Sequence, residues 1–163
     1  MLYNAVNMKI IKLYHGTNCK FSRIDLSKSR KSRDFGTGFY TTTLFEQAKK
    51  WAENLYIRYG DSGKFVKEYE AVLDYRLNIL TFDSMNRDWL EFIKENRMNG
   101  GLSHTYDIVR GAVANDNTMR TIALYVSGVY TEEMALEQLQ FFKANDQISF
   151  HTRKVLRFSY ILF

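Results

Sequence analysis

The sequence predicts a single α+β domain with a mixed sheet core, and three observations support this prediction. Short β-branched and aromatic runs alternate with longer amphipathic stretches along the chain. Their order is strand, helix, strands, helices and strands, which is typical of an α+β arrangement. The length of 163 residues suits one hydrophobic core, and no repeat or linker interrupts it, so we expect one domain over residues 1–163.

Periodicity and turn signals divide the chain into expected elements. Apolar or alternating runs bounded by turn residues indicate strands, and apolar residues spaced three and four apart indicate helices. The expected strands cover residues 9–14, part of 34–43, 64–73, 76–82, 106–114, 147–151 and 154–162, with a polar loop over 17–33. The expected helices cover residues 44–59, 85–97, 119–126 and 131–143.

The first two expected helices have recognisable start signals. Thr43 precedes the first helix and Glu46 lies three residues further on, which is the pattern of a capping box. Either Asp83 or Ser84 is placed to cap the second helix. Glycines follow both helices, as is usual at helix C-termini.

Composition excludes several classes of protein. The single Cys19 leaves no internal disulfide framework and no cysteine-rich zinc site, and we expect no metal cofactor. It favours a reducing compartment such as a bacterial cytoplasm. No run approaches the roughly 20 apolar residues that span a bilayer, and no signal-peptide pattern opens the chain. We therefore expect a cytoplasmic protein without a membrane partner.

The net charge of +5 is partly clustered. Basic residues concentrate in Lys20–Arg33 and again at Arg153, Lys154 and Arg157. A basic loop can meet the pyrophosphate of a dinucleotide or a nucleic acid backbone, and it is equally typical of a solvated surface. No nucleic-acid-binding motif accompanies the cluster.

Three local patterns carry the candidate chemistry. A histidine ends the first expected strand in Leu13–Thr17, which reads LYHGT. A glycine turn delivers an aromatic residue into the next strand in Gly36–Thr42, and a helix with Trp51 follows. A polar segment, Asn145–Phe150, leads into a late strand. Each pattern is weak alone, since a Gly-x-Gly without a third glycine at a helix start is not the Rossmann fingerprint.

In this order, the patterns resemble the ADP-ribosyltransferase superfamily, in particular its His-Tyr-Glu branch, which includes the poly-ADP-ribose polymerases and diphtheria-like toxins. A strand of that branch ends in His-Gly-Thr or His-Gly-Ser, which matches His15–Thr17. A Gly-x-Gly-x-Tyr strand follows, which matches Gly36–Tyr40, and the next helix carries a second ring, for which Trp51 has the comparable place. The resemblance covers residues 9–53 strongly and the C-terminal third loosely. It extends to a group of small bacterial members of the superfamily.

The resemblance implies a fold, a substrate and partners. The fold is a split β-sheet core with flanking helices. The substrate is NAD⁺, from which ADP-ribose is moved to a protein, a nucleic acid or a small molecule. A toxin or defence role is compatible with the resemblance, and it would add an antitoxin or inhibitor protein as a partner.

The residue types suit NAD⁺. Its flat cationic nicotinamide can stack between Tyr40 and Trp51 with a cation–π contribution. The resemblance implies that His15 bonds a ribose hydroxyl and that the backbone of Gly16 pairs with the carboxamide, because glycine permits a close approach. The expected cofactor contacts also include Thr17, Gly38 and Thr42.

The late strand departs from the family pattern. The family places a glutamate there, bonded to the ribose 2′-hydroxyl, whereas this chain has Gln147 and no glutamate in or after the strand. Gln147 is the third expected catalytic residue, beside His15 and Tyr40. It carries no charge, and losing one preorganised electrostatic contact costs about 10²–10³ in rate. Asp146 and Asp116 are alternative acids, although adjacent strand residues point to opposite faces.

Three hypotheses follow. The first is an ADP-ribosyltransferase, and the second is a module that binds NAD⁺ or ADP-ribose without turnover, which Gln147 motivates. The third is a nucleic-acid-binding protein that uses Lys20–Arg33. We expect His151 to be structural or on the surface, since the three histidines lack a metal-ligand spacing. A dyad of Cys19 with a histidine lacks an oxyanion motif.

Overall fold

The computed structural model describes residues 9–73, 76–101, 103–113, 116–140, 145–156 and 159–161. The strands are β1 (Lys9–Thr17), β2 (Phe39–Thr41), β3 (Phe65–Leu73), β4 (Ile79–Thr81), β5 (Ile108–Val113), β6 (Asn145–Phe150) and β7 (Ser159–Ile161). The helices are α1 (Phe45–Tyr59), α2 (Arg87–Asn99), α3 (Asp116–Val126), α4 (Glu132–Leu139), α5 (Arg153–Leu156) and the 3₁₀ turn η1 (Leu26–Lys28). The α+β class is confirmed.

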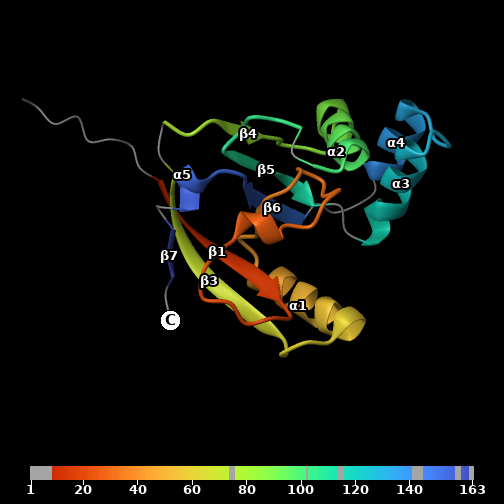
Figure 1. The fold of residues 1–163 in the computed structure, drawn as a ribbon. Coiled ribbons are helices and arrows are strands. Elements are labelled where there is room, and N and C mark those ends of the chain that lie inside the picture. Colours follow the sequence, from red (N-terminus) through yellow and green to blue (C-terminus); the bar gives the residue numbers. More distant parts are fainter. Residues whose placement is uncertain are drawn as a thin grey trace, which may run out of the picture.

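The strands form two sheets that meet at one point. Sheet A has the order β1-β3-β7 and is antiparallel, and sheet B has the order β2-β6-β5-β4, in which β4 and β5 run parallel. Tyr14 of β1 and Thr42, just after β2, exchange backbone hydrogen bonds of 2.8 and 3.0 Å. The two sheets lie above one another in Figure 1, and this bridge joins their edges.

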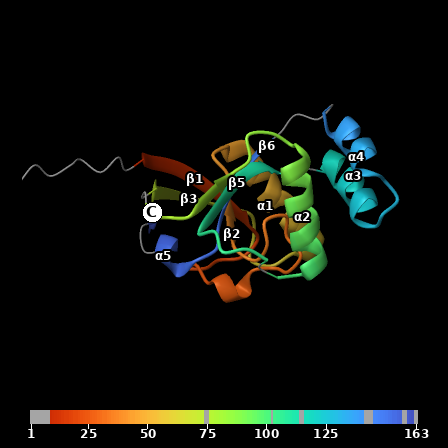
Figure 2. The same ribbon diagram turned by 90° about the horizontal axis from the view of Figure 1, so that it is seen from above.

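Two apolar clusters fill the space on either side of sheet B. The first lies between the two sheets and joins Leu13 and Tyr69 of sheet A to Ile148 and Phe150 of sheet B. The second lies between sheet B and the helices α2, α3 and α4, which gather at one side of the molecule in Figures 1 and 2, and has the fully buried Trp89 near its centre. Sheet B is therefore covered on both faces.

Helix α1 packs on the face of sheet A that points away from sheet B. Strand alternation turns Leu13 toward sheet B and the next residue, Tyr14, toward α1, where its ring meets Phe45 edge-on at 5.4 Å. Gly16 lies on the same face as Tyr14. A Cβ atom at Gly16 would lie only 2.0 Å from the carbonyl oxygen of Ala48, so a glycine is required for α1 to approach β1 this closely.

Several expectations about element ends are wrong. Thr43 and Glu46 form no capping box, because the N-cap is Leu44 without a side-chain bond and the Thr43 hydroxyl donates to Asp146 instead. The cap of α2 is Asn86, whose Oδ1 accepts the N–H of Trp89 at 3.0 Å, and not Asp83 or Ser84.

The C-terminal elements also differ from the prediction. The strand expected over 154–162 is a short helix, Arg153–Leu156, followed by β7, which pairs with β3. A short run of mixed apolar and basic residues is compatible with the periodicity of a helix and with that of a strand. The helix expected over 131–143 begins after Thr131 and is described to Leu139, and residues 141–144 lie outside the described part of the chain. The strand expected over 147–151 begins two residues earlier, at Asn145, and ends before His151.

Candidate functional site

His15 lies where β1 and β2 separate. Beyond the Tyr14–Thr42 bridge, the next pair in the same register would be Gly16 and Tyr40, but these residues form no bridge. The His15 imidazole enters the gap instead, and its Nδ1 lies 2.7 Å from the carbonyl oxygen of Tyr40. The ring also stacks on Phe39 with a centroid distance of 4.4 Å. The imidazole is therefore held on two sides.

The hydrogen bond fixes the tautomer of His15. A carbonyl oxygen only accepts, so Nδ1 must carry the proton. Burial lowers the pKa of His15 to about 4, and the nearby positive charge of Lys67 acts in the same direction, so the ring is neutral at pH 7. Nε2 is then an acceptor without a hydrogen-bond partner among the described residues. It is not among the polar side-chain atoms of the described residues that are both buried and unpartnered.

The main chain of Gly16 faces the same gap. In an antiparallel strand, both backbone polar groups of one residue point to the same side, and successive residues alternate. Tyr14 directs its groups to Thr42, so Gly16, two residues further along, directs its N–H and C=O away from β3. No hydrogen bond from a described loop or side chain reaches these two groups. The steric reason for the glycine is the contact with α1, and not the approach of a ligand.

Tyr40 uses its hydroxyl within the protein. The hydroxyl donates to the carbonyl oxygen of Gly36 at 2.6 Å and accepts the N–H of Phe35 at 3.0 Å. Burial raises the pKa of Tyr40, so the phenol stays protonated. The hydroxyl anchors the turn that precedes β2, and the ring remains as the part of Tyr40 that can meet another group.

The guanidinium group of Arg33 contacts the rings of both Tyr40 and Trp51. The Cζ atom of Arg33 lies 5.9 Å from the centroid of Tyr40 and 5.4 Å from the centroid of Trp51. Trp51 lies on α1 with 39% of its surface exposed. Tyr40 and Trp51, the two rings expected to stack on the nicotinamide, thus contact one common group, and this group is a cation of the protein itself. Sequence reasoning did not single out Arg33, because nothing distinguishes it from the other basic residues of Lys20–Arg33.

Gln147 lies on β6 beside the end of β2. Continuing the register of Thr41 and Ile148, it comes opposite Thr42. Its side chain is only 7% exposed, and its Nε2 is buried without a hydrogen-bond partner. The amide therefore has an unused donor inside the protein, which is uncommon in native structures. The geometry does not bring it into contact with His15.

Asp146 is committed to the scaffold. Its carboxylate accepts the hydroxyl of Thr42 at 2.5 Å and the backbone and side chain of Thr43, and it thereby stabilises the first turn of α1. The Thr42 hydroxyl in turn accepts the N–H of Leu44 at 3.1 Å. Asp146 is thus occupied, and the side chain of the other candidate acid, Asp116, lies outside the described part of the structure.

Thr17 and Gly38 also have structural partners. The Thr17 hydroxyl lies 3.3 Å from the Sγ atom of Cys19 and accepts the N–H of the same residue, so Cys19 pairs with a threonine and not with a histidine. A Cβ atom at Gly38 would lie 2.6 Å from the Nδ1 atom of His151, which explains the glycine.

A buried group around His151 was not found from the sequence. Its Nδ1 lies 2.8 Å from the carbonyl oxygen of Thr37 and its Nε2 lies 2.7 Å from the Ser149 hydroxyl. The ring of His104 meets it edge-on at 4.6 Å. Burial lowers the pKa of His151 to about 4, with a smaller effect from His104. His151 is therefore structural, since it holds the glycine turn that leads to Tyr40.

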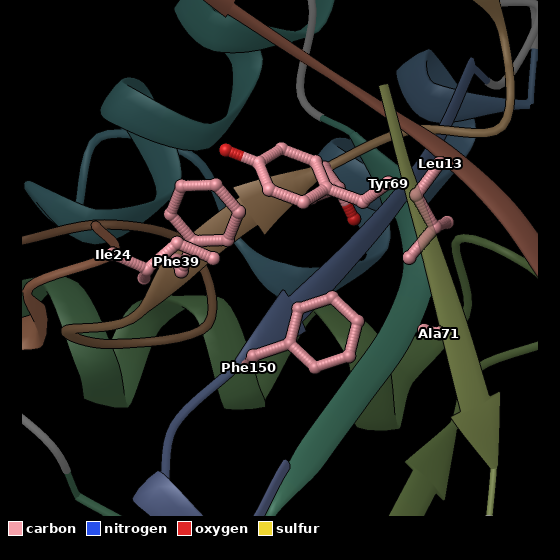
Figure 3. Close-up of a pocket in the computed structure, with 7 residues that line it drawn as sticks. Leu13, Ile24, Phe39, Tyr69, Ala71 and Phe150 are labelled. Atoms are coloured by element: carbon pink, nitrogen blue, oxygen red, sulfur yellow. The ribbon is translucent and has the colours of Figure 1, made fainter. Parts of the chain in front are cut away.

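The cavity between the two sheets is too small for a nucleotide. The cavity has a volume of about 10 Å³, room for about one water molecule. Figure 3 shows side chains that line it, including Leu13, Phe39, Tyr69 and Phe150. Burial raises the pKa of Tyr69 to about 12, and its hydroxyl lacks a partner. A second hollow lies along the exposed face of α2. Neither contains His15, Tyr40 or Gln147.

No metal site and no membrane-spanning helix are found in the described ranges of the chain. Within those ranges, no group of three or more histidine, cysteine or carboxylate side chains is placed to hold a metal ion. None of the helices in the described ranges combines the length and the apolar character needed to cross a bilayer.

Comparisons with known proteins identify a family. Residues 11–162 match the family described as "Protein of unknown function (DUF3990)", so the chain belongs to this family. Searches of curated proteins and of solved structures gave no match.

Proposed function

We propose that this member of the DUF3990 family binds NAD⁺ where β1, β2 and α1 meet, and that it transfers ADP-ribose from it. The observation that carries the proposal is the pair of rings, Tyr40 and Trp51, which both contact the flat cation of Arg33, while His15 bonds the backbone carbonyl of Tyr40. The nicotinamide of NAD⁺ is also a flat cation, and aromatic faces attract such groups. The resemblance of His15–Thr17 and Gly36–Tyr40 to the ADP-ribosyltransferases supports the same ligand.

The gap beside His15 offers the polar groups that the rest of the nicotinamide riboside needs. The Gly16 N–H and C=O, which point to the open edge of β1, complement the C=O and N–H₂ of a carboxamide. The neutral His15 accepts at Nε2, so it suits a ribose hydroxyl, which donates. A protonated histidine would offer only donors.

The proposed reaction breaks the bond between C1′ of the ribose and the nicotinamide nitrogen. The nicotinamide leaves as a neutral molecule with the bonding electron pair, and positive charge develops on the ribose. A nucleophile of the acceptor then bonds to C1′ and loses its proton. Groups that accept hydrogen bonds from the ribose hydroxyls stabilise this charge, and Gln147 and His15 are the candidates.

A second candidate function is binding without turnover. Gln147 is neutral, and the neighbouring carboxylate of Asp146 is bonded to Thr42 and Thr43, so neither supplies a free negative charge. If this holds for the loaded protein, it binds NAD⁺ or ADP-ribose and releases it unchanged.

Two measurements separate these functions. Calorimetry with NAD⁺ measures binding, and NAD⁺ labelled in the nicotinamide or in the adenylate measures nicotinamide release and transfer to lysate components. Binding with transfer supports the transferase, whereas binding alone supports the module. Absence of binding contradicts both.

Two exposed rings of α1 provide a matched test of the site. Trp51 and Tyr56 are 39% and 40% exposed, but of the two only Trp51 contacts Arg33 beside Tyr40. We expect Trp51→Ala to weaken NAD⁺ binding about tenfold, the effect of losing one stacked ring with its cation–π contribution. Tyr56→Ala should leave binding unchanged. If both substitutions changed NAD⁺ binding equally, the nicotinamide would not stack on Trp51.

A further inference from the structure

We propose that Arg33 is an internal placeholder for the nicotinamide: its guanidinium lies against the rings of Tyr40 and Trp51 and must leave them when the ligand enters. The inference rests on the proposed function, because it concerns the same site. It adds a regulatory element, since the free protein holds its own site closed.

Among the described residues, the contacts of the Arg33 guanidinium are with aromatic rings. No described carboxylate lies within ion-pair distance of it, and no described group accepts a hydrogen bond from it. The adjacent Asp34 pairs with Arg97 instead, through bonds of 2.6 and 2.9 Å. A half-buried arginine ordinarily has a planar acceptor such as a carboxylate. Here its two aromatic neighbours are the contacts that fix its position.

The backbone that carries Arg33 is fixed on several sides. The N–H of Gly36 donates to the carbonyl oxygen of Arg33 at 3.0 Å, and Gly36 has a φ of 85°, which favours glycine. The Tyr40 hydroxyl holds both Gly36 and Phe35, and the Asp34–Arg97 pair ties the turn to α2. The side chain can therefore swing out by rotation of its own bonds while the turn stays in place.

The chemistry of the exchange favours competition. Guanidinium and N-substituted nicotinamide are both planar and both carry one positive charge. Each is attracted to the faces of the same two rings. Because a ring face has room for only one of them, the guanidinium and the nicotinamide compete for this place. An arginine beside a dinucleotide can also have the opposite role, as a receptor that binds the pyrophosphate. The two roles predict effects of opposite sign when Arg33 is replaced.

The test uses three ligands and two variants. NAD⁺ has the cationic ring and the pyrophosphate, nicotinamide riboside has only the ring, and ADP-ribose has only the pyrophosphate. Arg33→Gln removes the placeholder. Arg30→Gln is the matched control, because Arg30 belongs to the same loop but stacks on Tyr59, at 4.5 Å.

For Arg33→Gln, we expect about tenfold tighter binding of NAD⁺ and of nicotinamide riboside, the factor that corresponds to about 1.4 kcal/mol and to the loss of two cation–π contacts. ADP-ribose binding should stay the same, and Arg30→Gln should change none of the three. Weaker binding of NAD⁺ and ADP-ribose by Arg33→Gln would overturn the placeholder in favour of a pyrophosphate receptor. Unchanged binding would overturn it as well. If neither the wild-type protein nor the variant binds NAD⁺, the proposed function fails first and the inference fails with it.

A ligand-free measurement tests the contact itself. The chain has two tryptophans, and Trp89 is fully buried, so acrylamide quenches mainly Trp51. Arg33→Gln should increase this quenching, and Arg30→Gln should not. Unchanged quenching in Arg33→Gln would show that the guanidinium does not cover Trp51, whatever the ligands do.

Discussion

Replacing Gly16 by alanine should destabilise the protein through helix α1. The added Cβ would lie 2.0 Å from the carbonyl oxygen of Ala48 and 3.0 Å from the backbone nitrogen of Ala52. An ordinary contact needs about 3.5 Å, so α1 would have to retreat by about 1.5 Å. Both neighbours are backbone atoms of one helix, so no side-chain rotation relieves the overlap. Overpacking of this kind costs up to about 3 kcal/mol.

Urea denaturation measures the effect. We expect a lower midpoint with an unchanged slope, and a melting temperature lower by about 6–12 °C for a chain of this size. Gly101→Ala is the matched control, since a Cβ there meets nothing within 4 Å and Gly101 is not at a positive φ. It should be neutral or slightly stabilising, because alanine reduces the entropy of the unfolded chain. If both variants unfold at the same urea concentration, α1 does not pack on β1 as described.

Three further substitutions or conditions give clear expectations. Burial lowers the pKa of His151 from 6.5 to about 4, so the unfolded chain binds its proton first. This histidine should lower the free energy of unfolding by up to about 3 kcal/mol between pH 6.5 and pH 4, in addition to a similar effect of His15, whose pKa is also lowered to about 4. Urea midpoints across this range should therefore vary less in His151→Asn, without becoming constant. Asp146→Ala should lower the free energy of unfolding by about 1–2 kcal/mol, because it removes the acceptor for Thr42 and Thr43 at the start of α1. A loss smaller than about 0.5 kcal/mol in urea denaturation would contradict this role. Gln147→Glu should raise nicotinamide release about 10²-fold if the side chain faces the ribose; a folded variant without this gain would move the catalytic position away from Gln147.

The fold was predictable where the sequence signal is local and repeated. The α+β class and the helix of residues 44–59 follow from periodicity, and the helix is found at Phe45–Tyr59. Element ends were less predictable, because the partners that set them are distant in sequence. Thr43 bonds Asp146, 103 residues away, and so it does not form a local capping box. The C-terminal run lacked a distinct period, and of the strand predicted over 154–162 the first three residues belong to α5, whereas residues 159–161 form β7.

The candidate site divides in the same way. His15, Tyr40 and Trp51 were marked by the order of their motifs, and the structure brings His15 to the backbone of Tyr40 and the two rings to one guanidinium. The guanidinium itself was not predictable, because which cation of a basic loop reaches two rings depends on the conformation of the turn at residues 33–36. The reasons for Gly16 and Gly38 were also hidden, since each glycine is required by an atom that another element brings close.

The use of the Tyr40 hydroxyl limits what a ligand can gain at this site. Its single proton goes to the Gly36 carbonyl, and one lone pair accepts the Phe35 N–H, so the oxygen is committed to the turn that carries Arg33. What remains for a ligand is the face of the ring, and Arg33 covers that face in the free protein. The same tyrosine therefore shapes the site and positions the group that closes it. It follows that a ligand attracted only to hydrogen-bonding groups has little reason to displace Arg33, whereas a flat cation can replace it at equal charge.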